Sequence, residues 1–388
     1  MRKRLIAAAA ALLLCGCGSN VPDHELSAKE TTTAQTAPSD SKPRKSGDDS
    51  KPAVTTAPTE TTTTTTTTTA PPEDAGMVMT TTAAPKKQNY DYVNGCILAY
   101  SGTPQMRAME QYFYSTDTGA YLAKSVDNFA KKAGSGVNVY LMVIPTATEL
   151  YCPEELANDS LDQTVCTQEI YSKLKNSKGV LVNGILKKHK AEYLYSRTDF
   201  HWQPLAAYYA AKVFAEEAGV DFPLLNTYEA VERHGFLGGF YYVSNITSLS
   251  QYPDDFTYYK PANVDKLKVK YYDRAFTSGV ESRLFFEDNG VDASYTVVLG
   301  TDDTIAEIKT GVKNDRVLVL SKDSYGNALT PFLTQSFSKI YVIDHRFFET
   351  NTIDFIKKVG ATDVLFAYNA SSAGNPDRIA LIEQLMNR

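Results

Sequence analysis

Short apolar runs alternate with amphipathic stretches over residues 89–388. Each run is bounded by turn residues, and apolar positions at helical spacing follow most of them, which is the pattern of buried strands covered by helices. Strands that alternate with helices predict an α/β fold with a mainly parallel sheet, in which ligands bind beyond the carboxyl ends of the strands. The predicted strands are residues 96–100, 138–145, 179–185, 316–321, 340–344 and 363–368.

Three predicted helices have recognisable ends. Ser115 or Thr116 caps the first, and Gly134 ends it. The second covers residues 203–218 and the third covers residues 376–386.

Two further segments need separate interpretation. The first predicted strand leads to an amphipathic stretch at residues 106–112, which fits a helix. Residues 234–297 break the alternation and are rich in Tyr, Asp, Gly and Ser. We interpret this second segment as an irregular or β-rich, Tyr-rich insertion, or as a lid.

The first 88 residues have a different character. Residues 1–17 combine a basic start with an apolar run that is too short to span a bilayer, as in a signal peptide. The end of this run resembles a bacterial lipobox, in which Cys17 would carry a lipid that anchors the chain to a membrane surface. An ordinary secretory signal is the alternative. Residues 18–88 are Thr/Pro-rich and offer little to bury, so we expect a disordered tether at the bacterial cell surface.

Charge and cysteine content narrow the class of protein. A formal net charge of −6 at pH 7, without a basic cluster, indicates no nucleic-acid partner. Residues 89–388 contain Cys96, Cys152 and Cys166, with no CxxC metal spacing. In an exported domain we expect Cys152 to pair with Cys166 and Cys96 to be buried.

The segment "TDFHW" carries the clearest chemical signal. It places Asp199, His201 and the only Trp of the chain, Trp202, directly before a predicted helix. Residues two apart share one face of an extended segment but not of a helix, and Pro204 disfavours helical conformation just before it. We therefore expect Asp199 and His201 to be neighbours, either as a general base with its orienting acid or as a structural histidine satisfied by a carboxylate. A metal site here is poorly supported, because the chain has only five His.

Ser324 is the candidate nucleophile. It lies in a polar turn between a predicted strand and a helix, at the carboxyl end of the strand. Helix N–H groups at such a turn can stabilise an oxyanion. The alternative is that Ser324 or Asp323 only caps the helix.

The motifs "RTDFHWQPLAAYYA", "LSKDSYGNALTPFL" and "IYVIDHRFF" resemble the bacterial DHHW protein family, which is related to the SGNH-hydrolase-like proteins of alginate O-acetylation. "GCILAYSGTPQMRAMEQYF" and "NVYLMVIPTATELYCPEE" look like its N-terminal strands. The resemblance covers nearly all of residues 89–388. It implies an SGNH-hydrolase-like, flavodoxin-like three-layer sandwich, with Ser324 as nucleophile, His201 as base and Asp199 orienting the imidazole.

This chain departs from the family pattern at two places. Phe200 replaces the second residue of the family's Asp-His-His-Trp tetrad. The oxyanion donors are also unclear, and the candidates are the amides of Ser324 and Tyr325, with Gly300 as a further possibility.

Three more side chains have open alternatives. Arg346 is a candidate for binding an anionic glycan or phosphate, or else forms a surface ion pair. Tyr195 is a candidate sugar-stacking residue, or else a packing residue. Trp202 is expected to pack behind His201.

Two functions of different classes remain. The first is a cell-surface lipoprotein that transfers or removes O-acyl groups on an extracellular polysaccharide or cell-wall glycan, without a cofactor or metal. The resemblance also implies a membrane protein that supplies the acyl group. The second is a non-catalytic surface module of the same fold that binds glycan or a partner protein. A metal-dependent phosphoesterase using Asp199 and His201 is a third idea.

Overall fold

An eight-stranded sheet is the centre of the structure, a computed structural model that describes residues 88–156, 161–287 and 295–388. The expected signal peptide, Cys17 and the tether up to residue 87 lie outside the described residues. In the described part, no helix combines the length and the hydrophobicity needed to cross a bilayer.

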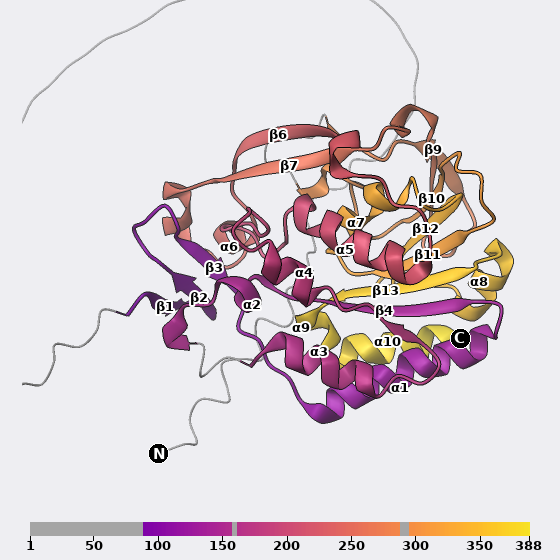
Figure 1. Cartoon of the computed structure of the whole chain (residues 1–388), viewed down its shortest axis with the longest axis horizontal. Helices are drawn as coiled ribbons and strands as arrows, with labels where there is room; N and C mark the ends of the chain where they lie inside the picture. The colour runs from indigo at the N-terminus through magenta and orange to yellow at the C-terminus, as the bar shows by residue number, and fades with distance from the viewer. Residues whose placement is uncertain (1–87, 157–160, 288–294) are drawn as a thin grey trace, which may run out of the picture. The chain divides into compact units, whose positions relative to one another are not determined.

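The strand order of this sheet is β5-β4-β13-β11-β12-β10-β8-β9 (Figure 1). The first five strands are parallel to one another and the last three are antiparallel to their neighbours, so the expected mainly parallel sheet is confirmed. In sheet order the strands are β5 (Lys178–Gly179), β4 (Asn138–Ile144), β13 (Asp363–Asn369), β11 (Val317–Lys322), β12 (Lys339–Asp344), β10 (Ile305–Lys309), β8 (Lys268–Tyr272) and β9 (Gly279–Ser282).

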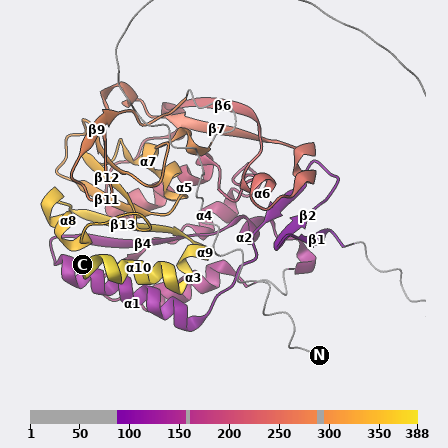
Figure 2. The same cartoon turned by 180° about the vertical axis from the view of Figure 1, so that it is seen from behind.

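Helices cover both faces of the sheet, which confirms the three-layer sandwich (Figures 1 and 2). Strand β4 shows why two layers are needed, because its alternate residues belong to different hydrophobic clusters on the two faces. One face packs against α4 (Asn183–Lys188), α5 (Pro204–Ala218) and α7 (Gly326–Leu333). The other packs against α1 (Thr116–Ala133), α3 (Gln163–Ser172), α8 (Thr352–Val359) and α10 (Pro376–Met386).

The predicted helix boundaries are confirmed where local capping chemistry sets them. The Ser115 hydroxyl accepts the N–H of Thr118 at the start of α1, and Gly134 follows its end. Pro204 is the first residue of α5, and Gly219 ends that helix in the left-handed conformation at φ 65°.

A small antiparallel sheet lies outside the main one and corrects two expectations. It contains β1 (Tyr90–Val93), β2 (Cys96–Ala99) and β3 (Arg107–Met109). The run at 96–100 therefore forms a strand of this small sheet, and the stretch at 106–112 contains a strand instead of a helix. The run at 179–185 is also wrong as a long strand, because β5 has two residues and α4 begins at Asn183.

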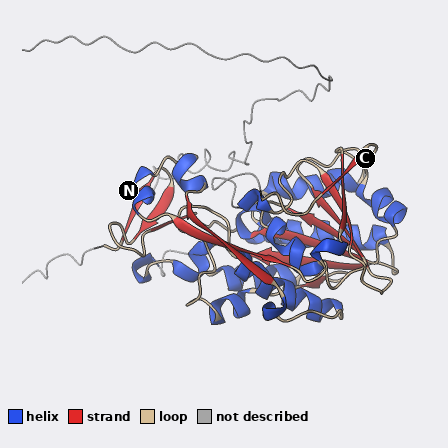
Figure 3. Cartoon of the chain, turned by 90° about the horizontal axis from the view of Figure 1, so that it is seen from above, coloured by secondary structure: helices blue, strands red, loops and turns tan. Residues whose placement is uncertain are grey.

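The segment 234–297 is integrated into the fold. Strands β6 (Glu229–Phe236) and β7 (Asp254–Lys260) form an antiparallel ribbon, and the short helix α6 (Gly239–Tyr242) lies between them in the sequence (labelled in Figure 1; Figure 3 gives the view from above). Strands β8 and β9 from the same segment extend the main sheet. The described part of the segment is thus β-rich, as expected, and two of its strands belong to the main sheet.

Candidate active site

Ser324 lies at the carboxyl end of β11, in the turn that leads to α7. Strand β11 is flanked by β12 and β13, and all three run in the same direction. Their carboxyl ends therefore meet at one edge of the sheet, where α/β proteins place their ligands. Ser324 is half-buried there, whereas the preceding residues of β11 are buried.

Asp199, His201 and Ser324 form a continuous chain of hydrogen bonds. His201 Nδ1 lies 2.6 Å from Asp199 Oδ1, and His201 Nε2 lies 2.8 Å from Ser324 Oγ. With the Nδ1 proton donated to Asp199, Nε2 can accept the serine proton, as a general base requires. The geometric expectation from "TDFHW" and "SKDSYGN" is therefore met by residues 123 positions apart.

Backbone N–H groups fix the carboxylate of Asp199. Its Oδ1 also accepts the N–H of His201 at 2.9 Å, and its Oδ2 accepts the N–H of Gly239 at 2.6 Å. Burial alone would raise the pKa of Asp199, but His201 and these N–H groups lower it below its ordinary value. Asp199 is thus held ionised in the orientation that positions His201.

The β6–β7 ribbon and the turn that joins its strands also hold the chain that leads into the Asp-x-His motif, through hydrogen bonds that the sequence did not reveal. Asp254 is fully buried, and its oxygens accept the N–H groups of Arg197 and Thr198 at 2.9 and 2.8 Å. The Thr198 hydroxyl also donates to Asp254 and accepts the N–H of Gly238. Hydrogen bonds therefore connect the residues that precede Asp199 to both Asp254 and Gly238.

Close packing also fixes this motif. A Cβ atom at Gly238 would lie 2.1 Å from Asp199 Cβ, and one at Gly239 would lie 2.1 Å from the Phe200 ring. Only glycine therefore fits at these two positions. The Gly-Gly pair is the one sequence signal that could have pointed to this contact.

Aromatic side chains enclose the imidazole. The Tyr295 ring stacks on His201 with centroids 3.8 Å apart, and its hydroxyl donates to the carbonyls of Ser324 and Tyr325. Trp202 is fully buried and its indole N–H donates to the Tyr325 carbonyl at 3.0 Å. The expectation that Trp202 packs behind the site is confirmed. Phe200 packs tilted against His201 on another side.

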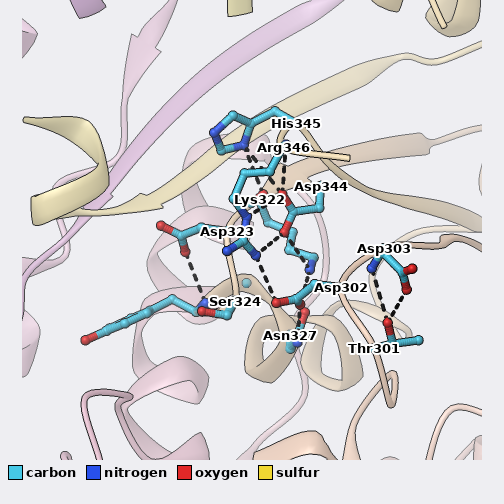
Figure 4. Close-up of polar contacts among 12 residues, drawn as sticks. Thr301, Asp302, Asp303, Lys322, Asp323, Ser324, Asn327, Asp344, His345 and Arg346 are labelled. Carbon is cyan, nitrogen blue, oxygen red and sulfur yellow. Dashed lines mark hydrogen bonds and ion pairs between the residues drawn. The ribbon is translucent and has the colours of Figure 1, made fainter. Parts of the chain in front are cut away.

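A buried network of charges lies beneath the Ser324 turn (Figure 4). The Lys322 ammonium lies 2.6 Å from Asp302 and 3.3 Å from Asp344. Arg346 contacts the same two carboxylates, at 2.9 and 2.6 Å. Burial would raise the pKa of Asp344, but Lys322 and Arg346 hold it below its ordinary value. Asn327, in the first turn of α7, donates to Asp302 and links the helix to the network.

This network corrects the expectation for Arg346. Its guanidinium is occupied by Asp302 and Asp344 and is largely buried, so the ion-pair alternative is right, although the pair is not on the surface.

Two predicted oxyanion donors are already used within the protein. The N–H of Tyr325 donates to Asp323 Oδ1 at 3.0 Å, and the N–H of Gly300 donates to the Thr296 carbonyl at 3.1 Å. Both assignments are therefore wrong in this structure. Asp323 also accepts the N–H of Asn369, so it orders the turn as the capping alternative proposed.

Two other predictions are wrong for different reasons. Tyr195 is fully buried and its hydroxyl donates to the Pro145 carbonyl, so it cannot stack on a sugar. Cys152 and Cys166 form no disulfide. They pack against hydrophobic clusters on opposite faces of the sheet, which explains why they do not meet. Cys96 is buried, as expected.

The carboxylate of Asp199 offers little to a metal ion, because both oxygens already accept hydrogen bonds. Among the described residues, one group of side chains has ligand spacing, namely the exposed Glu232, His234 and Asp255 on the β6–β7 ribbon. It does not include any residue of the Ser-His-Asp arrangement.

Comparison with known proteins gives a consistent picture. A family model described as "DHHW protein" matches residues 95–343. The crystal structure of a DHHW family protein from Eubacterium siraeum is similar with a TM-score of 0.72 and 36% sequence identity, covering 76% of this chain and 97% of that one. No match was found among curated proteins.

More distant solved structures are also similar. Bacillus cereus PatB1, in a structure with a sulfonyl adduct, shares the fold with a TM-score of 0.57 and 18% identity over 75% of this chain and 96% of that one. The O-acetyltransferase domain of Pseudomonas putida AlgJ aligns with a TM-score of 0.43 and 14% identity, over 76% and 99% of the two chains. The match of the family model and the 36% identity over most of the domain lead to one conclusion: this chain belongs to the DHHW protein family.

Proposed function

We propose that the chain is a serine-dependent O-acyl transferase or esterase, with acetyl as the group and an extracellular polysaccharide as the substrate. The observation that carries the proposal is the hydrogen-bonded chain from Asp199 through His201 to Ser324. Three such groups at the carboxyl edge of a parallel sheet have the geometry of nucleophilic acyl transfer.

The reaction has two balanced halves. His201 Nε2 takes the proton of Ser324 Oγ as the oxygen attacks the acyl carbonyl carbon, and the resulting imidazolium stays paired with Asp199. The tetrahedral intermediate then breaks its bond to the donor's oxygen, which leaves with the proton from His201. In the second half, His201 takes a proton from a sugar hydroxyl or from water as its oxygen attacks the acyl carbon. The bond from that carbon to Ser324 Oγ then breaks, and Oγ regains the proton from His201.

The oxyanion would be stabilised by the N–H of Ser324. This amide makes no hydrogen bond within the described ranges, in contrast to the amides of Tyr325 and Gly300. Removing one donor from such a site typically costs two to three orders of magnitude in rate, so a single amide gives modest catalysis.

The location and partners of the enzyme are part of the same proposal. Cys17 would carry the lipid, and the Thr/Pro-rich tract would connect the anchor to the domain. A protein at this position could receive the acyl group from a membrane protein and transfer it to a cell-wall glycan.

The test uses two chemical probes on the purified protein. With p-nitrophenyl acetate we expect Ser324→Ala and His201→Ala to lower the rate at least about 100-fold. The fold relative PatB1 has a structure with a sulfonyl adduct, so methanesulfonyl fluoride is a suitable second probe. It should add one sulfonyl group to the wild type and none to Ser324→Ala.

A matched control separates the nucleophile from its strand. Ser321→Ala removes another serine hydroxyl from β11, one that bonds to Tyr368 away from the triad, and should keep the activity. Acetylated methyl glycosides in the product mixture would indicate a transferase, and acetate alone would indicate an esterase. Equal slow rates in the wild type, Ser324→Ala and His201→Ala would exclude the catalytic proposal.

A non-catalytic module that binds glycan or a partner is the second candidate. It is favoured by Phe200 in the family tetrad and by the two occupied amides at Tyr325 and Gly300. The sulfonyl probe discriminates the two, because a binding module would leave Ser324 unmodified.

A further inference from the structure

Glu110 is a carboxyl at the same edge of the sheet as Ser324, and the Ser-His-Asp arrangement does not use it. It directly follows β3, and its carbonyl accepts the hydroxyl of Thr148 in α2 (Ala147–Tyr151). Its Oε2 accepts the hydroxyl of Ser371 in α9 (Ala370–Ala373) at 3.2 Å. These helices follow the parallel neighbours β4 and β13, so both contacts hold Glu110 at the carboxyl ends of the strands.

The side chain is also close to the other half of the site. The N–H of Ala108, two residues earlier, donates to the Arg197 carbonyl at 2.9 Å, so β3 lies beside the chain that leads to Asp199. The charges that act on the Glu110 carboxyl come from His201, Asp199 and Asp323, which are residues of the site itself. Glu110 therefore interacts electrostatically with the imidazole and with the carboxylates beside it.

Glu110 is half-buried, and it differs from the buried carboxylates of the site in how few groups bind it. Asp199 accepts three N–H bonds, and Asp254 accepts two backbone N–H groups and the hydroxyls of Thr198 and Tyr193. Within the described ranges, the Glu110 carboxyl has the single long bond from Ser371 and no cation at ion-pair distance. A carboxylate has about four acceptor positions, so most of its capacity is unfilled.

Its surroundings make this carboxyl titrate in the neutral range. Burial raises the pKa of Glu110 to about 7, with the carboxylates of Asp323 and Asp199 adding to the rise and the Ser371 hydroxyl and His201 opposing it. The other titratable groups whose charges interact with it are the Tyr325 hydroxyl and the Cys96 thiol.

We propose that Glu110 binds the alcohol that accepts the acyl group, by accepting a hydrogen bond from a sugar hydroxyl next to the one that reacts. This proposal rests on the proposed function. A sugar carries neighbouring hydroxyls, so one can bind Glu110 while another loses its proton to His201. Water has no second hydroxyl to offer, so Glu110 favours transfer to a sugar over hydrolysis. The ionised carboxylate is the stronger acceptor, and the preference for sugar therefore increases as pH rises through 7.

The test measures how the acetyl group divides between sugar and water. The full-length protein receives p-nitrophenyl acetate as donor and each of a panel of methyl glycosides as acceptor, between pH 5.5 and 8.5. We expect the ratio of acetylated glycoside to acetate to rise through pH 7 in the wild type. Glu110→Gln should lower this ratio about 10-fold at pH 8 and remove its pH dependence, while p-nitrophenol release stays within about 3-fold. Glu281→Gln, an exposed change on β9, is the matched control.

Each contrary outcome has a distinct meaning. Suppose that p-nitrophenol release depends on Ser324, but Glu110→Gln has the same ratio of acetylated glycoside to acetate as the wild type at every pH. This result overturns the role of Glu110 only. That role is also overturned if p-nitrophenol release and acetyl transfer to the glycoside fall by the same factor in Glu110→Gln. It is likewise overturned if the wild type hydrolyses the donor but acetylates no glycoside. Release that is equal in the wild type and Ser324→Ala overturns the proposed function, and this inference with it. Circular dichroism of each variant checks that it is folded.

Discussion

Different kinds of interaction hold the two halves of the candidate site. Ser324 lies above a buried network of ion pairs, in which Lys322 and Arg346 share Asp302 and Asp344. The Asp-x-His motif is held by a backbone N–H group and glycine packing from the turn between β6 and β7, and by the stacked ring of Tyr295.

This difference separates stability from activity. A buried ion pair is costly to break, because the remaining charge has no water to solvate it. A hydrogen bond or a close contact at the ribbon contributes less to folding, but it sets the position of the base. Changes beneath Ser324 should therefore mainly unfold the protein, and changes at the ribbon should mainly inactivate it.

The largest expected effect is that of Lys322→Met. The variant keeps the aliphatic chain, of which 2% of the surface is exposed, but removes the charge between Asp302 and Asp344. We expect the free energy of unfolding to fall by about 3–5 kcal/mol, measured by urea denaturation. Lys309→Met, whose exposed ammonium lies 3.7 Å from the largely buried Glu307, is the control and should cost at most about 1 kcal/mol. Similar losses in the two variants would contradict the importance of the network.

The second largest expected effect is a pH dependence of stability that comes from His345, on the same side of the site as Lys322. Burial lowers the pKa of His345 to about 4 from its ordinary value of 6.5, although Asp344 opposes the shift, and Nδ1 lies 3.2 Å from the Lys322 carbonyl. The unfolded chain binds a proton at His345 below pH 6.5, whereas the folded one does not until about pH 4. Stability is therefore full above pH 6.5 and falls by about 3 kcal/mol in all as pH drops through 4.

Thermal unfolding between pH 4 and 7.5 measures this loss. His345→Gln should unfold with a weaker pH dependence over that interval, even if it is less stable at pH 7.5. An unchanged slope would show that His345 is not the group responsible.

Gly239→Ala tests the base side. The new methyl group would overlap the Phe200 ring and displace the N–H that Asp199 accepts. We expect hydrolysis of p-nitrophenyl acetate to fall about 100-fold, equivalent to about 2.7 kcal/mol in the barrier, with a smaller loss of stability. Gly136→Ala has open space around it and should leave both quantities unchanged. If Gly239→Ala lowers the stability strongly but the folded variant hydrolyses the donor at the wild-type rate, the distinction between the two halves is wrong.

Tyr295→Phe should have the smallest effect. It removes the hydroxyl that donates to the Ser324 and Tyr325 carbonyls but keeps the ring stacked on His201. We expect a loss of about 1 kcal/mol in stability and at most about a 10-fold loss in rate. Comparison with Tyr295→Ala, which also removes the ring, would separate the hydrogen bonds from the stacking.

The sequence was informative where local chemistry decides the structure. The caps at Ser115 and Gly219 and the proline at the start of α5 each depend on a few neighbouring residues. The same is true of the alternating faces of the central strands. The proximity of Asp199 to His201 also followed from local geometry, and its pairing with Ser324 followed from the family resemblance.

The sequence was uninformative where distant segments decide. No local pattern indicates that Tyr295 contacts the Asp-x-His motif, or that the amides of Tyr325 and Gly300 are occupied. Apolar composition likewise did not distinguish a long strand at residues 179–185 from the short strand β5 followed by the helix α4. Such contacts depend on how the chain returns to itself, which periodicity does not encode.

The separation of 123 positions between His201 and Ser324 has a consequence for the order of folding. Closing so long a loop costs chain entropy that only contacts formed afterwards repay, so this pairing is among the late events. The intervening chain forms the β6–β7 ribbon and the antiparallel strands β8, β9 and β10 of the main sheet. A nascent or partly unfolded chain therefore carries an ordinary serine, and the role proposed for Ser324 requires the complete domain.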